Sequence, residues 1–151
     1  MCGGIAFKIK QISKKDLARY YSQQEIEQIE KTGQAQSFFW SKKPVLPVEK
    51  NRKVELVDWG NRDKEIKLPK TGWAKQESTN DGKWAYLKPE FVKIPVEKGF
   101  EKGVWFEPKS KDFQGLVVQR KDQKKVYMVT KPATPEYLKL TKHNREPVEI
   151  G

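Results

Sequence analysis

The stretch GGIAFKI, residues 3–9, sets the architecture that we expect for the chain. Its apolar side chains alternate with small or polar ones, which is the two-residue period of a half-buried β-strand. Directly before it stand Met1 and Cys2, and Cys2 is the only cysteine of the sequence. The sequence therefore predicts a first strand that begins immediately after a single thiol.

Two helices are expected after this strand. Ser13 stands three residues before Asp16, and Ser22 stands three residues before Glu25, which is the spacing of a helix-starting capping box. Gly33 is placed to end the second helix, because glycine tolerates the left-handed backbone of a helix C-terminus. We expect both helices to cover one face of a sheet.

The rest of the chain is dominated by short β runs that proline and glycine interrupt. We expect strands at residues 36–40, 45–48, 54–59, 91–96, 104–106, 114–118 and 126–130. Residues 61–83 are polar and carry turn signals, and Thr134-Pro135-Glu136 begins a short helix. Without repeats or linkers, residues 1–151 form one α+β domain with a mostly antiparallel, barrel-like sheet and a few short covering helices.

Charge is the strongest feature of the composition. The 151 residues include 31 Lys and Arg against 20 Asp and Glu, a net charge of +11. A polyanion, most simply nucleic acid, is one partner that this charge favours. The other interpretation is a lysine-rich surface in a lysine-rich proteome.

Several classes of protein do not fit this composition. One cysteine excludes an intrachain disulfide framework, and no Cys/His cluster offers a metal site. No apolar run approaches the ~20 residues of a membrane span, and no signal peptide is visible. We therefore expect a cytoplasmic protein without metal or membrane partner.

Cys2 has a chemical potential that depends on Met1. Removal of Met1 would put an α-amine and a thiol on one residue, and this 1,2-aminothiol condenses with an aldehyde to a thiazolidine ring. The two groups titrate near ~8 and ~8.5, so local positive potential would make both reactive at neutral pH. The alternative is a small buried cysteine at the start of the first strand.

Short pieces spread over nearly the whole chain resemble one known family, the SRAP proteins (SOS-response-associated peptidases, abasic-site sensors of single-stranded DNA). In chain order they are Met1-Cys2-Gly3-Gly4, Pro44-Val45-Leu46-Pro47-Val48, Val57-Asp58-Trp59-Gly60, Trp73-Ala74-Lys75-Gln76-Glu77-Ser78, residues 95–102, Gln114-Gly115-Leu116-Val117, Tyr127-Met128-Val129-Thr130 and His143-Asn144-Arg145-Glu146-Pro147-Val148. Cys2 together with the His-x-Arg-x-Pro-Val motif is the most specific pair.

The resemblance implies an activity in the DNA damage response. Met1 would be removed, by the protein itself acting as a peptidase or by a housekeeping enzyme. Cys2 would then form a thiazolidine DNA–protein crosslink with the aldehyde of an abasic site in single-stranded DNA, and so protect the lesion. We expect a monomer that needs no cofactor and that is associated with the nucleoid if the source is bacterial.

The same resemblance assigns roles to individual residues. Glu101 aligns without a gap on the family's acid/base glutamate, although Glu97 and Glu107 are close competitors. His143 would be the second acid/base group. Arg145 would sit beside a phosphate, where its planar fork is suited to bind.

Four further residues concern DNA and the departures from the family pattern. Lys75 replaces an arginine that grips the DNA backbone, and Gly3 permits a close approach of the ligand. Trp73, in a polar loop, is our candidate for contact with DNA, whereas Trp59 and Trp105 are expected in the core. Gly4 replaces an arginine, and Trp73 replaces an asparagine that donates a hydrogen bond near the reaction centre.

Two alternative hypotheses assign the chain to other functional classes of protein. A non-covalent binder of single-stranded nucleic acid would keep the basic surface and the aromatic residues and would not need Cys2. An N-terminal-cysteine amidotransferase is suggested by Cys2-Gly3-Gly4-Ile5, which is similar to a glutaminase start. The downstream Asn and Arg motifs of that family are missing here, and hydrolysis of free glutamine would separate it from the first two.

Overall fold

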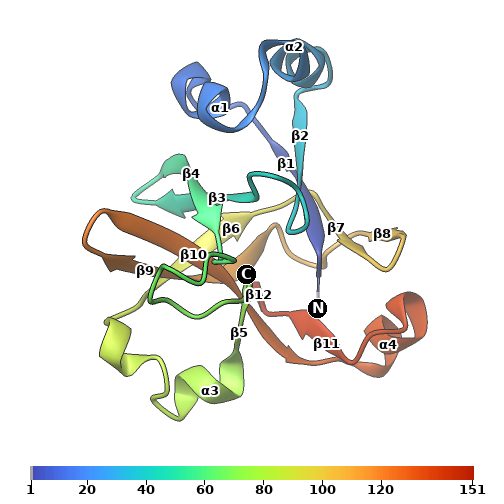
Figure 1. Cartoon of the computed structure of the whole chain (residues 1–151). Coiled ribbons are helices and arrows are strands. Elements are labelled where there is room, and N and C mark those ends of the chain that lie inside the picture. Colours follow the sequence, from blue (N-terminus) through green and yellow to red (C-terminus); the bar gives the residue numbers. More distant parts are fainter. Residues whose placement is uncertain (1) are drawn as a thin grey trace.

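The structure, a computed structural model that describes residues 2–151, places a small sheet beside a closed barrel (Figure 1). The small sheet has the order β2-β1-β7-β8, with β1 (Gly4–Lys8) between β2 (Gln34–Phe38) and β7 (Lys98–Glu101), and β8 (Val104–Phe106) at one edge. Its pairings are antiparallel. The predicted first strand is thus a central strand.

The barrel is a ring of five strands: β10 (Gln123–Pro132), β4 (Lys53–Trp59), β3 (Val45–Lys50), β6 (Glu90–Pro95) and β9 (Asp112–Arg120). The ring closes because β9 pairs with β10. The β4–β10 pairing is parallel, and the other four pairings around the ring are antiparallel. The predicted α+β fold with a mostly antiparallel, barrel-like sheet is confirmed.

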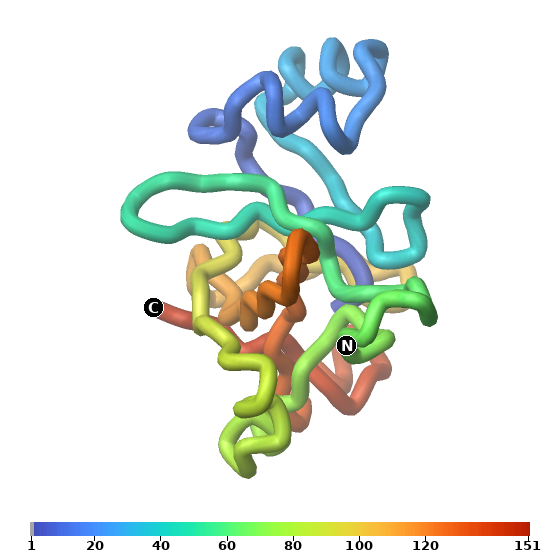
Figure 2. The backbone as a smooth tube through the Cα atoms, turned by 60° about the vertical axis from the view of Figure 1, so that its left-hand side comes forward, coloured from blue at the N-terminus to red at the C-terminus, as the bar shows by residue number. Residues whose placement is uncertain are grey.

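Three short strands extend the barrel. β5 (Trp73–Lys75) pairs in parallel with β10, β11 (Arg145–Pro147) pairs antiparallel with β10, and β12 (Glu149–Ile150) pairs antiparallel with β9. β10 therefore receives both the segment around Trp73 and the segment after His143. Figure 2 shows how the middle and the end of the chain approach the N-terminal end.

Three helices begin after the predicted capping residues, and α2 also ends at the predicted glycine. Ser13 caps α1 (Lys14–Tyr20), and Ser22 and Glu25 form a capping box at α2 (Gln23–Thr32), which ends at Gly33 with φ of 74°. Thr134 caps α4 (Pro135–Thr141). Within residues 2–151, no helix has the length and apolar composition needed to cross a membrane.

The core fills the barrel and continues under the first two helices. Its larger cluster includes Leu17 of α1, Ile26 and Ile29 of α2, and Cys2 itself. The largest fully buried side chains are Trp59, Tyr127, Phe7 and Phe113. The expected covering role of α1 and α2 agrees with this packing.

Two segments differ from the sequence prediction. The polar stretch 61–83, expected as a loop, contains β5 and the short helix α3 (Gln76–Asn80), and a 3₁₀ helix, η1 (Ala85–Leu87), follows it. Lys98 and Gly99, expected near a connection, belong to β7. β5 and β7 are short and pair with strands far away in sequence, so the local pattern of the chain carries little signal for them.

Candidate functional site

The thiol of Cys2 is enclosed by the small sheet. The Gly3 amide donates to the carbonyl of Phe100 (2.9 Å), and the Phe39 amide donates to the carbonyl of Gly3 (3.0 Å), so the pairing of β1 continues to its first residues. The Cys2 side chain is 0% exposed, and its Sγ donates to the carbonyl of Gly4 (2.9 Å). The alternative of a buried cysteine before the first strand therefore describes its packing correctly.

Burial also determines the protonation of Cys2. Loss of hydration raises the pKa of the Cys2 thiol to about 12, and the negative charge of Glu101 raises it further. The reactive 1,2-aminothiol that the sequence predicts would form only on removal of Met1, so its reactivity stays a prediction. At neutral pH the Cys2 thiol is protonated, so a nearby base is needed before it can attack.

Glu101 and His143 meet beside Cys2 although 42 positions separate them in the chain. Glu101 ends β7, and its side chain is 6% exposed; His143 follows α4, and its side chain is 20% exposed. Glu101 Oε1 lies 3.7 Å from His143 Nε2. The other carboxyl oxygen, Oε2, lies 4.0 Å from the point that a Cβ on Gly3 would occupy.

The competing carboxylates lie elsewhere. Glu97 accepts a hydrogen bond from Gln34 Nε2 (3.0 Å) and lies 3.8 Å from Lys8 Nζ. Lys8 is the last residue of β1, so Glu97 lies near the opposite end of this strand from Cys2. Glu107 is exposed beyond β8. Of the three glutamates that the sequence offered, Glu101 is the one that faces His143.

The ring of His143 is held in one orientation. Its Nδ1 accepts a hydrogen bond from the Arg145 amide (3.1 Å), so in the neutral ring the proton is assigned to Nε2, which faces Glu101. Burial lowers the pKa of His143 below its ordinary value. A neutral imidazole that presents an N–H toward the Glu101 carboxyl group is the result.

Arg145 does not lie open to solvent. Its guanidinium forms two hydrogen bonds with Glu77 (2.7 and 2.9 Å) and one with the carbonyl of Thr130 (2.9 Å). The hydrogen bonding from Arg145 lowers the pKa of Glu77 to about 2. The predicted phosphate contact would have to compete with Glu77, which ties α3 to β11 through Arg145.

Trp73 has a different place from the one predicted. It belongs to β5, its ring lies 4.8 Å from Phe39 and 6.0 Å from Trp59, and its Nε1 donates to the carbonyl of Cys2 (2.9 Å). The predicted stacking on DNA is therefore not favoured, because the ring is half-buried among aromatic neighbours. The family resemblance implied that replacing an asparagine by Trp73 removes a hydrogen-bond donor near Cys2. The indole N–H of Trp73 is itself a donor there, to the carbonyl of Cys2.

The remaining predicted residues surround this centre. Gly3 is half-buried, and Lys75 is exposed at the end of β5. Gly4 lies under the ring of Phe38: a Cβ at Gly4 would come within 3.0 Å of that ring. Phe38 thus occupies the space in which a longer side chain at position 4 would begin.

Sequence reasoning missed Tyr137 of α4. Its hydroxyl is buried and has no hydrogen-bond partner in the part of the chain that the structure describes. Burial raises the pKa of the Tyr137 phenol, and the nearby Cys2 and Glu101 raise it further. No sequence signal distinguishes Tyr137 from an ordinary core tyrosine on an amphipathic helix.

The site thus assembles a thiol, a carboxyl group, a neutral imidazole and a phenol in one enclosed place. Such a set can move protons during addition to a carbonyl group. Among the described residues, no group of three or more His, Cys, Asp or Glu side chains could hold a metal ion. A scan against protein-family models and a search of the curated proteins find no match to this chain.

Proposed function

We propose that this chain is a short, divergent member of the SRAP family that senses abasic sites in single-stranded DNA and crosslinks to them through Cys2. The observation that carries the proposal is the meeting of Glu101 and His143 beside Cys2, with 3.7 Å between Oε1 and Nε2. The family resemblance named these three residues from three distant segments. Their convergence gives each one the neighbours that the chemistry needs.

The proposed reaction begins with hydrolysis of the bond between Met1 and Cys2, by the protein or by a housekeeping peptidase. Met1 lies outside the described residues. The freed amine of Cys2 adds to the open aldehyde of the abasic sugar, and the resulting carbinolamine loses water to give an iminium ion. The thiol then adds to the same carbon and gives up its proton, so one water leaves for each thiazolidine formed.

Glu101 is the group that we assign to these proton transfers. Its Oε2 lies 4.0 Å from the position of a Cβ on Gly3, its charge raises the pKa of the Cys2 thiol, and a carboxyl group can act as acid in one step and base in the next. A thiol whose pKa is raised to about 12 requires such a base. We assign His143, whose Nε2 lies 3.7 Å from Glu101 Oε1, to positioning this carboxyl group.

The partner in this proposal is single-stranded DNA that carries an abasic site. The net charge of +11 supports binding to a polyanion, and it predicts that affinity falls steeply with salt. We place the protein in the cytoplasm as a monomer, at the nucleoid if the source is bacterial. Its task there would be protection of the lesion during the DNA damage response.

One experiment tests the proposal directly. The Met1-processed protein is mixed with single-stranded DNA that holds one abasic site, and the products are separated on a denaturing gel. We expect a shifted band whose mass equals protein plus DNA minus one water. Cys2→Ala should abolish the band, and Glu101→Gln should slow its appearance about 10²-fold.

Two controls make the result specific. Glu97→Gln removes a neighbouring carboxylate that pairs with Gln34 and Lys8, so it should leave the rate unchanged. DNA with intact bases should give no band with any variant. If no Cys2-dependent band forms while salt-dependent DNA binding is intact, the covalent mechanism is wrong.

A second candidate function has its own supporting observation. The Cys2 thiol is fully enclosed and protonated, which is the usual state of a structural cysteine. A non-covalent module that binds single-stranded nucleic acid would have this property. It would bind abasic and intact DNA alike and would tolerate Cys2→Ala.

A further inference from the structure

Four aromatic side chains gather on the outer side of the small sheet, and we call them the aromatic surface: Phe38, Trp40, Phe100 and Trp105. Trp40 stacks on Phe38 with 4.8 Å between ring centroids, and Phe100 lies 4.8 Å from Trp105. Phe38 is 5.5 Å from Phe100, which joins the two pairs. Trp40 is 61% exposed and Trp105 is 38% exposed, so large ring faces are open to solvent.

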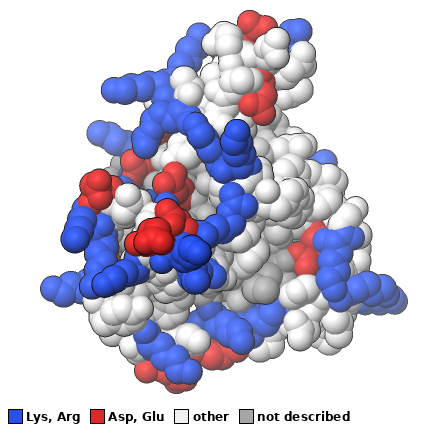
Figure 3. Space-filling view, in the orientation of Figure 1, with Lys and Arg blue, Asp and Glu red and all other residues white. Residues whose placement is uncertain are grey.

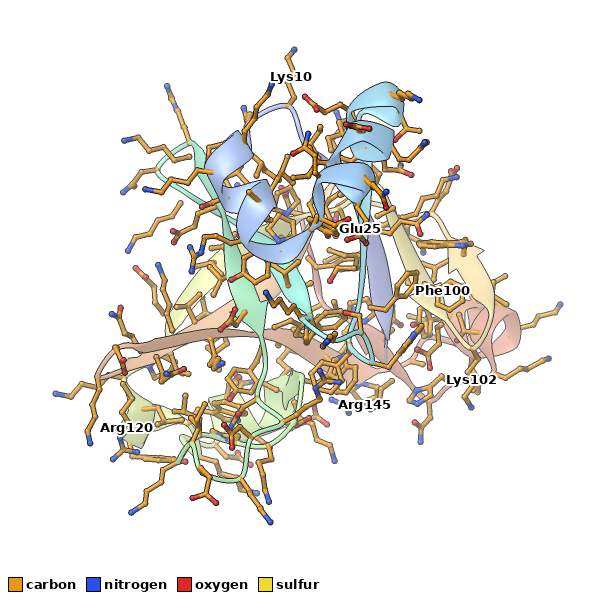
Figure 4. The ribbon with its side chains drawn as sticks, turned by 45° about the horizontal axis from the view of Figure 1, so that its top comes forward. Lys10, Glu25, Phe100, Lys102, Arg120 and Arg145 are labelled. Atoms are coloured by element: carbon orange, nitrogen blue, oxygen red, sulfur yellow. The ribbon has the colours of Figure 1, made fainter. Side chains whose placement is uncertain are left out.

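The aromatic surface begins where the candidate site ends. A Cβ on Gly3 would lie 3.0 Å from the ring of Trp40 and 4.0 Å from Glu101 Oε2, so only Gly3 separates the aromatic surface from the carboxyl group of the site. In Figure 4, Phe100 and Lys102 lie on the same side of the molecule. A chain whose reacting sugar reached Cys2 would therefore place its neighbouring nucleotides over these rings.

Basic residues continue from the aromatic surface. Lys42 and Lys43 follow Trp40 in the same loop, and they line a hollow of about 580 Å³ together with Arg19 and Arg62, against the carboxylates of Asp58 and Asp63. Figure 3 shows an uncharged area over β7 and β8 with Lys and Arg side chains on either side of it. Lys42 and Lys43 also line a second hollow together with Phe38, so the cationic side chains adjoin the aromatic surface, and we call the two together the strip.

The chemistry of this strip fits one occupant best. Single-stranded nucleic acid offers unpaired bases, which stack on aromatic rings, and phosphates, which attract lysine and arginine. The chain's net charge of +11 complements a polyanion. An apolar protein partner would use the rings but would gain nothing from the basic end.

We infer that the aromatic surface stacks the unpaired bases next to the lesion, and that the phosphates of that strand run toward Lys42 and Lys43. The inference rests on the proposed function, because it assumes that the strand enters at Cys2. It transfers the predicted base contact from Trp73 to Trp40 and Trp105. Trp105, expected in the core, is thereby assigned to the binding surface.

The test measures binding without any crosslink. Fluorescein-labelled oligothymidylate with intact bases is titrated with protein, and an oligomer of equal length built from base-free tetrahydrofuran nucleotides is titrated in parallel. Trp40→Ala should weaken binding of oligothymidylate about tenfold and leave binding of the base-free oligomer unchanged. Trp40→Phe keeps a ring and should retain most of the affinity.

Two controls match these variants. Tyr86→Ala removes an aromatic side chain that is 68% exposed on η1, away from the strip, and should not change the affinity. Lys42→Gln should weaken binding of both oligomers and reduce the slope of log affinity against log salt by about one unit. This pair separates base contacts from phosphate contacts.

The outcomes are distinct. If Trp40→Ala and Tyr86→Ala bind oligothymidylate with equal affinity, the inference is wrong. This holds even if the denaturing gel shows the Cys2-dependent crosslink of the proposed function. If the wild type is a dimer that Trp40→Ala converts to a monomer with unchanged DNA affinity, the surface joins two copies and the inference also falls. A base-dependent loss of affinity at Trp40, together with no Cys2-dependent band on the denaturing gel with abasic DNA, supports the stacking surface and refutes the covalent function alone.

Discussion

At the scale of single residues, burial decides the chemistry of the candidate site. Cys2 and Glu101 are 0% and 5% exposed, and no shell of water surrounds their polar atoms. The Cys2 thiol keeps its proton because ionisation in this enclosure would leave the charge poorly solvated. In the proposed reaction a base next to Cys2 must therefore take this proton.

His143 gives a residue-scale prediction because it is the only histidine of the chain. Burial lowers the pKa of His143 in the folded protein below its value in the unfolded chain, near ~6.5. The unfolded state therefore binds a proton more readily as the pH falls. The stabilising difference is fully present above about pH 6.5 and is lost as the pH drops through the folded pKa.

We expect the free energy of unfolding to decline from pH 7.5 to pH 5.5, as measured by urea denaturation. His143→Gln cannot titrate in this range and should flatten the decline. A parallel decline in wild type and His143→Gln would show that another group causes it.

At the scale of elements, β1 shows how a strand can be specified by its neighbours. Gly4 faces Phe38 across the β1–β2 pairing and Phe100 across the β1–β7 pairing. The ring of Phe38 takes the space above Gly4, so a side chain there would displace part of the aromatic surface. Glycine at position 4 is thus a packing requirement of this sheet.

We predict that Gly4→Ala lowers the free energy of unfolding by about 1–3 kcal/mol, because overpacking forces the Phe38 ring to move. Urea denaturation would measure the loss. Phe38→Leu in the same chain should restore part of it, so the two substitutions should couple in a double-mutant cycle. Additive effects would mean that Gly4 matters for a reason other than Phe38.

The elements also show what sequence patterns can and cannot predict. The first strand, the capped helices and the runs that became β3, β4, β9 and β10 have a local period or a capping residue, so they were predicted within a few positions. β5 and β7 are short strands, and long-range pairing with β10 and β1 creates them. Such strands leave no period in the sequence.

The candidate site was predictable in part for the same reason. Cys2, Glu101 and His143 were found through motif resemblance, and their proximity is a property of the fold. The orientation of Trp73 toward the Cys2 carbonyl and the enclosure of Tyr137 depend on how β5 and α4 pack. The aromatic surface needs the four strands β2, β1, β7 and β8 side by side before its rings are neighbours.

At the scale of the whole molecule, one carboxylate joins the helical end to the barrel. Asp58 of β4 accepts a hydrogen bond from the Tyr20 hydroxyl (2.7 Å) and another from Lys125 Nζ (3.1 Å). The Lys125 side chain is 11% exposed. Removing Asp58 would leave a largely buried ammonium group without this carboxylate.

We predict that Asp58→Ala lowers the free energy of unfolding by about 1–3 kcal/mol in urea denaturation. Glu55→Ala is the matched control: Glu55 lies on the same strand and pairs with Lys124, but both side chains are close to half exposed. Its loss should cost less than about 1 kcal/mol. Equal losses for the two variants would contradict the role of Asp58.

The parallel seam between β4 and β10 has a consequence for the time course of folding. It joins Asp58 to Lys125 and Trp59 to Val126, partners that are 67 residues apart, whereas the β3–β4 and β9–β10 hairpins join neighbours in sequence. Loop closure over such a distance is slow compared with hairpin formation. We expect the hairpins to form early and the ring to close late, so the fluorescence of Trp59 should report the final step of folding.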